Sequence, residues 1–183
     1  MYNSSMTRLN QTLLLNRLVE IASTPQPLYM VLIGAPGSGK STFIKALGER
    51  LDLVVGSTDD QIDKYAASNG MTYSQAFGKL NFKTLKRQME EDLREGARRG
   101  KHCVVDQTNM GRKQRKDKLE WASPRHAKVA IDFDVPDKVL IERCDARANA
   151  TGKLIPRHVL FSMLKNHEAP SKDEGFDYVF TLT

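Results

Sequence analysis

The sequence predicts an α/β domain with a mostly parallel sheet of five strands and helices on both faces. Short apolar runs rich in branched residues alternate with longer segments of helical periodicity. This alternation is typical of βαβ units. The segments between successive runs are long enough for right-handed crossovers. A glycine-rich loop stands between the first apolar run and the next helical segment. Each expected element follows from local signals along the chain.

The first expected element is an amphipathic helix over residues 7–22. Its apolar positions fall on one helical stripe, at Leu9, Leu13, Leu14, Leu18 and Ile21. The segment STPQP ends it, because proline cannot continue a helix. We therefore expect an N-terminal amphipathic helical extension, residues 1–26, and a main domain, residues 27–183. The helix either packs on that domain or binds a partner.

The first half of the main domain is expected to hold two strands. The runs LYMVLI and LDLVVG have strand character, and STDD after the second supplies residues that cap a helix. A long helical pattern follows, with Phe77, Leu80, Leu85, Met89 and Leu93 as candidate buried positions. In chain order we expect a strand at 28–33, a helix at 40–51, a strand at 51–56, a helix near 60–69 and a helix at 74–100.

The second half is expected to add three strands, which completes a set near residues 28, 53, 103, 129 and 178. HCVVD and AKVAIDFDV are β-branched or apolar runs, and Pro136 suits the first turn of a helix. In chain order we expect a strand at 102–106, a helix at 112–121, a strand at 127–135, helices at 137–148 and 155–167, and a strand at 176–182.

Composition limits the classes of protein to consider. The chain has 183 residues and 40% hydrophobic residues, which suits one globular domain. It lacks both a signal-peptide pattern and an apolar run of about 18 residues, so we expect no membrane span. Two cysteines are too few for a disulfide framework or a zinc site. We expect a cytoplasmic protein. Its oligomeric state is not readable from the sequence.

The net charge of +6 is compatible with a polyanionic partner, and equally with a basic surface that maintains solubility. Two basic runs, residues 97–101 and 112–118, are either phosphate-backbone contacts or solvated helix faces. No aromatic residue interleaves with the second run, so it does not indicate a stacking groove.

The loop GAPGSGKS, residues 34–41, matches the pattern G-x-x-x-x-G-K-[ST] at every fixed position. Glycines let backbone N–H groups turn inward around an anion, and the following helix adds its N-terminal dipole. Lys40 can reach the β- and γ-phosphates of ATP, and Ser41 can ligate Mg²⁺. The predicted nucleotide-binding residues are Gly34, Ala35, Pro36, Gly37, Ser38, Gly39, Lys40, Ser41 and Thr42.

Carboxylates follow the next two predicted strands. Because the carboxyl ends of parallel strands line the ligand crevice, they should face the γ-phosphate. Asp59 is the candidate base and Asp60 a candidate substrate-site residue; the alternative for each is to cap the following helix. Asp106 can ligate Mg²⁺ through water, hold the acceptor or form an Asx turn. Asn109 is a weaker substrate-binding candidate, which turn chemistry explains equally well.

Arg143 and Arg147 are four residues apart, so they share one face of a helix. They stand at the edge of the polar, glycine-containing stretch ANATGK. Two guanidinium groups so placed can clamp a transferring phosphoryl group when a lid closes. Alternatively, they are solvated partners of Glu142 and Asp145. With a nucleotide loop in the same chain, we favour the lid.

Taken together, the sequence resembles the phage polynucleotide kinases and related small P-loop kinases. The resemblance spans residues 28–178 and is carried by GAPGSGKST, TDD, VVDQTN, R-x-x-x-R, KLIP and EGFD. It implies an ATP- and Mg²⁺-dependent kinase that phosphorylates a nucleic-acid hydroxyl, with DNA favoured. In that reading Asp59 is the base, Asp106 orients the acceptor, and Arg143 with Arg147 forms the lid. A phage-encoded chain would act in the host cytoplasm.

Two departures bear on the substrate. Where the end-healing phage enzyme has an acceptor-binding arginine, this chain has Ile62, with Lys64 two residues further on. From the length of the chain we also expect no phosphatase domain of the kind that such enzymes often carry. Other phage kinases of similar appearance phosphorylate the 5-hydroxymethyl group of hydroxymethyluracil in DNA, which requires the base to leave the stack. Both substrates stay open.

Two further classes compete with a nucleic-acid kinase. One is a small-molecule kinase that acts on a nucleoside, a sugar or an antibiotic. The other is an ATP-binding module without chemistry, against which the paired aspartates and arginines argue.

Overall fold

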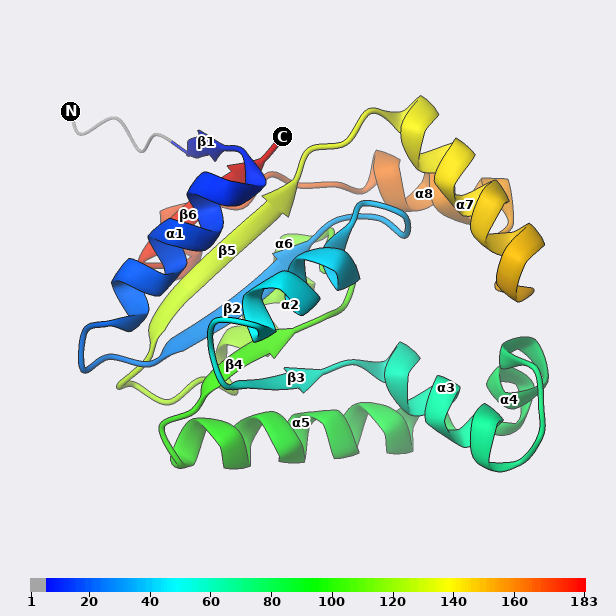
Figure 1. Cartoon of the computed structure of the whole chain (residues 1–183), viewed down its shortest axis with the longest axis horizontal. Helices are drawn as coiled ribbons and strands as arrows, with labels where there is room; N and C mark the ends of the chain where they lie inside the picture. Colours follow the sequence, from blue (N-terminus) through cyan, green and yellow to red (C-terminus); the bar gives the residue numbers. More distant parts are fainter. Residues whose placement is uncertain (1–5) are drawn as a thin grey trace.

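Six parallel strands form one sheet in the computed structural model, which describes residues 6–183 (Figure 1). Every neighbouring pair is parallel, as the α/β prediction requires. The spatial order is β1-β6-β5-β2-β4-β3. The strands are β1 (Thr7–Leu9), β2 (Leu28–Ile33), β3 (Leu53–Gly56), β4 (His102–Val105), β5 (Ala127–Phe133) and β6 (Tyr178–Leu182).

The prediction of five strands is wrong by one, because residues expected in the first helix form β1. Asn10 caps that helix, and its side chain accepts a hydrogen bond from the Leu13 amide at 3.0 Å. The chain before the cap is extended, and Thr7 lies opposite Phe180 on the open side of β6. A strand at this edge satisfies backbone groups that β6 would otherwise expose.

The described part of the chain contains eight α-helices, and Lys172–Glu174 form a short 3₁₀ turn. None of the helices between residues 6 and 183 has the length and apolar character needed to cross a membrane. The helices are α1 (Gln11–Ala22), α2 (Lys40–Gly48), α3 (Thr58–Ser68), α4 (Tyr73–Lys79), α5 (Phe82–Arg98), α6 (Arg112–Leu119), α7 (Asp137–Thr151) and α8 (Arg157–Lys165).

The long helix expected over residues 74–100 is two helices, α4 and α5. Leu80 leaves the helical conformation, and the Asn81 side chain accepts hydrogen bonds from the amides of Lys83 and Thr84. Asparagine competes with helix continuation in this way. The break allows α4 to pack against α3, where Ile62, Ala66 and Ala76 form a small separate core.

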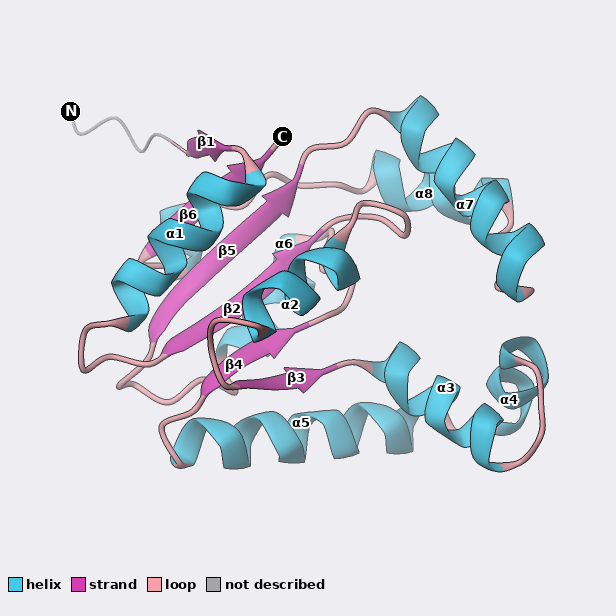
Figure 2. Ribbon diagram, in the orientation of Figure 1, coloured by secondary structure: helices cyan, strands magenta, loops and turns pink. Residues whose placement is uncertain are grey.

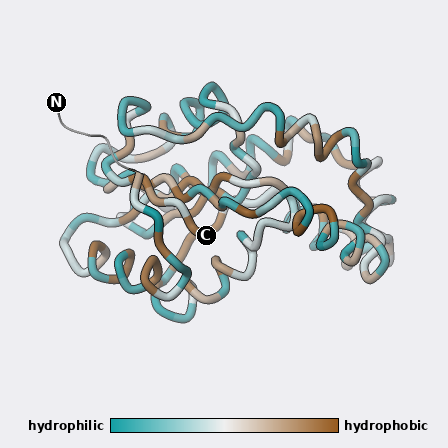
Figure 3. Tube along the Cα trace, turned by 90° about the horizontal axis from the view of Figure 1, so that it is seen from above, coloured by the Kyte–Doolittle hydropathy of each residue, from teal (hydrophilic) through white to brown (hydrophobic). Residues whose placement is uncertain are grey.

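Strand β2 is fully buried, and its alternating side chains supply two cores. Met30 and the other even positions pack with α1 and α2 on one face, whereas Tyr29 and the other odd positions pack with α5 on the opposite face. Figure 2 shows these helices on either side of the strands. In Figure 3 the helices change between hydrophilic and hydrophobic along their turns, as amphipathic helices do.

The N-terminal helix shares the first of these cores. Leu14, Leu18 and Ile21 of α1 pack with α2 and with strands β2, β5 and β6. Of the two roles considered for this helix, the structure therefore shows packing on the sheet.

The basic run at residues 112–118 is not simply a solvated face. Arg115 is fully buried, and its guanidinium pairs with Glu174 at 2.7 Å. It also donates hydrogen bonds to the carbonyls of Asn109, Met110 and Glu168. A buried charge of this kind is stable only when its donors are satisfied. Arg115 therefore holds the loop after β4 against the C-terminal part of the chain.

Candidate functional site

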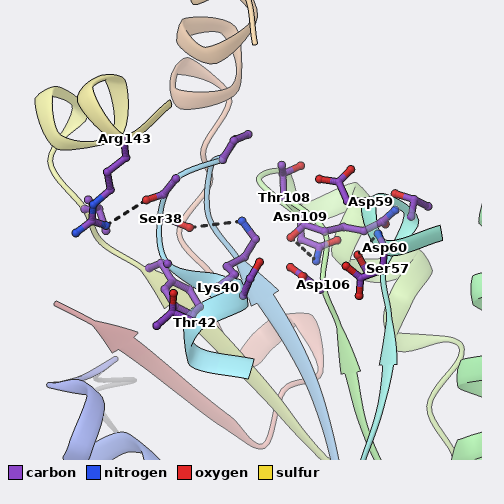
Figure 4. Close-up of a pocket in the computed structure, with 18 of the residues that line it drawn as sticks. Ser38, Lys40, Thr42, Ser57, Asp59, Asp60, Asp106, Thr108, Asn109 and Arg143 are labelled. Atoms are coloured by element: carbon purple, nitrogen blue, oxygen red, sulfur yellow. Dashed lines mark hydrogen bonds between the residues drawn. The ribbon is translucent and has the colours of Figure 1, made fainter. Parts of the chain in front are cut away.

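A pocket of about 970 Å³ lies at the carboxyl ends of the central strands. The glycine loop, the first turn of α3, the loop after β4 and the inner face of α7 line it (Figure 4). Ligand crevices of α/β sheets form at this edge. The predicted site residues that line the pocket are Pro36, Gly37, Ser38, Gly39, Lys40, Ser41, Thr42, Asp59, Asp60, Asp106, Asn109, Arg143 and Arg147.

Two predicted loop residues, Gly34 and Ala35, are not among those lining residues. Their carbonyl oxygens accept hydrogen bonds from the Lys40 ammonium, at 2.8 and 3.2 Å. The Gly34 amide donates to the carbonyl of Thr108 at 3.0 Å, which ties the glycine loop to the loop after β4. The structure thus places these two residues as supports of the loop.

Gly37 at the tip of the loop needs to be glycine for two reasons. Its φ is +84°, a backbone conformation that residues other than glycine rarely adopt. A Cβ atom there would also lie 3.3 Å from the carbonyl oxygen of Leu140 and from the sulfur of Cys144, both on α7. The loop tip is therefore packed closely under α7, and Arg143 donates a hydrogen bond to the Gly37 carbonyl at 3.1 Å.

Lys40 is a half-buried cation surrounded by neutral oxygens. Besides the two carbonyls, its ammonium donates to the Ser38 hydroxyl at 3.4 Å (Figure 4). Burial lowers the pKa of Lys40, and the charges of Asp106 and Asp59 oppose that shift. A cation held at a cost in desolvation favours a bound anion beside it. The site therefore suits phosphate.

Asp59 and Asp60 lie in the first turn of α3, and neither caps it. The cap is Ser57, whose hydroxyl accepts a hydrogen bond from the Asp60 amide at 3.2 Å. This corrects the capping alternative for Asp60. Both carboxylates are exposed at the pocket, where Asp59 accepts a hydrogen bond from the Tyr73 hydroxyl at 2.9 Å. Burial and the neighbouring Asp59 raise the pKa of Tyr73, so that Tyr73 stays a donor.

Asp106, at the end of β4, stands between these carboxylates and Lys40. Burial raises its pKa to about 6, the charge of Lys40 opposes that shift, and Asp60 and Asp59 add to it. Asp106 therefore interacts electrostatically with Lys40 and with the two carboxylates of α3 across the pocket.

We expect Asp106→Asn to stabilise the protein at neutral pH. The folded-state pKa lies above the usual value, so the folded chain binds this proton more tightly than the unfolded chain does. The penalty for ionising Asp106 in the folded state is complete above about pH 6 and falls away as the pH drops toward 4. The variant should gain roughly 1–3 kcal/mol at pH 7.5 and less than about 1 kcal/mol at pH 4.

Urea unfolding of both proteins at the two pH values measures this difference. Asp92→Asn, on the exposed face of α5, is the matched control and should show no pH-dependent gain. An equal gain at both pH values would contradict the proposed cause.

The side-chain amide of Asn109 forms hydrogen bonds with backbone carbonyls. It is 2% exposed, its φ is +47°, and its amide nitrogen donates to the carbonyls of Leu32 at 2.7 Å and Gln107 at 3.3 Å. Asparagine tolerates this left-handed conformation better than most residues. These contacts shape the loop after β4, which is the turn chemistry considered from the sequence.

The two arginines of α7 face the glycine loop. Asp145, one alternative partner, pairs instead with Arg157 at 3.0 Å. Within residues 6–183, the buried Nε of Arg147 has no hydrogen-bond partner. An unsatisfied guanidinium nitrogen at the pocket is a donor available to an anion. Both side chains therefore suit contact with phosphate oxygens.

The turn after α7 is attached to α3 and α4 across the pocket. The Ser74 hydroxyl donates to the carbonyl of Gly152 at 3.3 Å, and Lys153 forms an ion pair with Asp63. The Lys153 ammonium also lies 4.3 Å from the centre of the Tyr73 ring. Tyr73 thus joins this turn to Asp59. The local sequence carries no signal for these contacts.

The pocket wall beside the glycine loop also suits a nucleoside. Phe133, Val135 and Leu182 provide apolar surface there, and Gln11 provides an amide. For a metal ion, the exposed Ser41 hydroxyl is available next to Lys40. The described residues contain no group of three histidine, cysteine, aspartate or glutamate side chains placed to hold a metal. Mg²⁺ would therefore be held by Ser41 together with phosphate oxygens and water, which is its usual manner of binding.

Two curated proteins resemble the chain in sequence. Transcription factor bHLH140 of Arabidopsis thaliana is 27% identical over 164 residues, which cover 86% of this chain and 16% of that protein. Cytidylate kinase of Methanocella arvoryzae is 32% identical over 96 residues, which cover 51% and 54%. The chain thus spans about half the length of one relative and a sixth of the other.

One solved structure has a fold similar to that of this chain, and one protein family matches its sequence. A chain of the Pnkp1/Rnl/Hen1 RNA repair complex superposes with a TM-score of 0.66 at 24% identity, covering 84% of this chain and 47% of that one. Residues 30–170, most of this chain, match the family AAA_33, described as an AAA domain. These residues include the glycine loop, the carboxylates and both arginines. The chain therefore belongs to the AAA_33 family of P-loop domains.

Proposed function

We propose that this protein is an ATP-dependent kinase that transfers the γ-phosphoryl group to a hydroxyl of a nucleic acid. One observation carries the proposal. A single pocket holds the glycine loop with Lys40 on one side and the Asp59 carboxylate on the other. A triphosphate site and a base that faces it are the two parts that phosphoryl transfer to an alcohol requires.

The donor side binds and neutralises ATP. Amides of the glycine loop surround the β- and γ-phosphates, and Lys40 adds a positive charge. Arg143 and Arg147 line the pocket from α7, and Arg143 donates to the loop at Gly37. We expect both to contact the transferring group. Positive groups fixed in advance stabilise charge that develops in the transition state. Bound Mg²⁺ would neutralise further phosphate charge beside Ser41.

The acceptor side removes one proton. The substrate hydroxyl oxygen attacks the γ-phosphorus, the bond to the β,γ-bridging oxygen breaks, and ADP leaves with that electron pair. The hydroxyl proton passes to Asp59. The Tyr73 hydrogen bond holds Asp59 in place and leaves its second oxygen for the substrate. Asp106 lines the same pocket, and we assign it the role of orienting the acceptor.

Two features support a nucleic acid as the acceptor. Lys86 and Lys118 line the outer acceptor side of the pocket, where they can contact backbone phosphates. The related fold in an RNA repair complex supports the same substrate class. We favour DNA, as the sequence resemblance implies.

A base hydroxyl in DNA is the second candidate acceptor, and Ile62 favours it. The phage enzymes that act on terminal nucleotides place an arginine at this position, but here the side chain is fully buried between α3 and α4. It cannot hold a terminal nucleotide. A 5-hydroxymethyl group on a flipped-out base does not require that contact.

Transfer from γ-labelled ATP to a set of acceptors tests the proposal. The acceptors are an oligonucleotide with a 5′-hydroxyl, the same oligonucleotide with a 5′-phosphate, a 5′-phosphorylated oligonucleotide containing 5-hydroxymethyluracil, and a mixture of nucleosides and sugars. We expect label in the first or the third acceptor. Label only in the small molecules would overturn the nucleic-acid assignment in favour of a small-molecule kinase.

A further inference from the structure

Three aromatic side chains form a continuous row on α4 and the start of α5. The ring centres of Tyr73 and Phe77 are 6.0 Å apart, and those of Phe77 and Phe82 are 4.6 Å apart. Phe77 is 46% exposed and Phe82 is 43% exposed. Large apolar side chains exposed next to one another often mark a binding surface, whereas single ones do not.

The row borders the acceptor side of the pocket. At one end the Tyr73 hydroxyl donates to Asp59, the proposed base. At the other end Phe82 stands one helical turn before Lys86, on the same face of α5, and Lys86 lines the pocket. Figure 1 shows α4 beside α3, beyond the carboxyl ends of the strands. The aromatic row therefore runs along the rim of the pocket and away from the reacting carboxylate.

The segment that carries most of the row is positively charged. Residues 64–89 contain four lysines and one arginine, and no aspartate or glutamate. Beside this segment, Lys118 is buried and its ammonium lies 4.3 Å from the centre of the Trp121 ring. Burial and the charge of Lys86 lower the pKa of Lys118 to about 8. A phosphate next to Lys86 and Lys118 would relieve this repulsion.

We propose that Phe77 and Phe82 stack the bases of a single-stranded nucleic acid while neighbouring lysines pair with its phosphates, which guides a hydroxyl to Asp59. Aromatic side chains within a positively charged groove bind single strands in this manner, because every base has a face available for stacking once it is unpaired. An apolar protein partner would leave the lysines without partners. The proposal rests on the proposed function, whose acceptor it specifies as single-stranded.

Binding of a fluorescent oligothymidylate of about 12 nucleotides, measured by anisotropy, tests the site directly. Phe77→Ala and Phe82→Ala should each weaken binding by roughly 5- to 150-fold, because one stacked base contributes about 1–3 kcal/mol. Phe82→Trp should retain binding. Phe161→Ala is the matched control, since Phe161 is 50% exposed on α8, outside the row. It should bind like the unaltered protein.

Duplex DNA of the same length should bind more weakly than the single strand, since its bases are not free to stack. Equal affinity of the Phe77 and Phe82 variants and the control would overturn the proposal, as would equal affinity for the duplex. Circular dichroism melting of each variant establishes that it is folded.

Phosphoryl transfer distinguishes failure of this inference from failure of the proposed function. If the oligonucleotide is phosphorylated with the same KM by Phe77→Ala, Phe82→Ala and the unaltered protein, the stacking site is refuted and the kinase stands. If strand binding depends on both phenylalanines but label enters only small molecules, the stacking site stands and the nucleic-acid kinase is refuted.

Discussion

Lys40→Ala is expected to lower kcat/KM for phosphoryl transfer by on the order of 10³-fold, or more. The ammonium lies at the base of the glycine loop with neutral oxygens as its hydrogen-bond partners, so it is available to the phosphates. No other lysine of the loop segment lines the pocket in the described part of the chain. Transfer from labelled ATP measures the loss.

The same variant should also lose stabilisation by ATP. A ligand that binds only the folded state raises the melting temperature, by an amount that grows with the logarithm of its affinity. Without ATP, Lys40→Ala should melt no lower than the unaltered protein, because burial disfavours the charged lysine. Lys45→Ala, an exposed lysine of the same helix that does not line the pocket, is the control. Full transfer by Lys40→Ala would refute the assignment of the donor site.

Asp59→Asn is expected to lower kcat by roughly 10²- to 10⁴-fold and to leave ATP binding nearly unchanged. The amide has the shape of the carboxylate, and its oxygen can still accept the Tyr73 hydrogen bond, but it cannot take the hydroxyl proton. Stabilisation by ATP in a thermal melt should therefore persist while transfer is lost. This pattern separates the acceptor side of the pocket from the donor side.

Two controls support the assignment of the base. Asp92→Asn, an exposed change outside the pocket, should transfer at the normal rate. Tyr73→Phe should reduce kcat less than Asp59→Asn, because it removes only the hydrogen bond that positions the carboxylate. If Asp59→Asn keeps the full rate, Asp59 is not the base, and Asp106 becomes the carboxylate to test.

Local patterns along the chain predicted most of the fold. Residues 28–33 form β2 as expected, because six consecutive apolar residues require burial on both faces of a sheet. The strand near residue 103 and the helix that starts at Lys40 also lie where the sequence indicated. Such elements depend on side-chain periodicity and on turn chemistry, which neighbouring residues set.

The errors concern contacts between distant segments. Strand β1 exists because Thr7 reaches Phe180 at the far end of the chain. In the sequence, Arg115 is indistinguishable from the other basic residues of its helix. In the structure, Glu174 and three backbone carbonyls surround its guanidinium. The break at Asn81 has a local signal in the asparagine itself, but its effect is the packing of α4 on α3.

The candidate site likewise has one part that the local sequence predicted and another part that tertiary contacts form. The spacing of glycines, lysine and serine was sufficient to identify the phosphate-binding loop, since a short segment contains all the atoms that form it. The pairing of Tyr73 with Asp59, the attachment of Lys153 to α3, and the aromatic row that ends at Phe82 arise when the helices pack. Residues far apart in sequence meet there in an arrangement that the burial of the shared core dictates and no local spacing encodes.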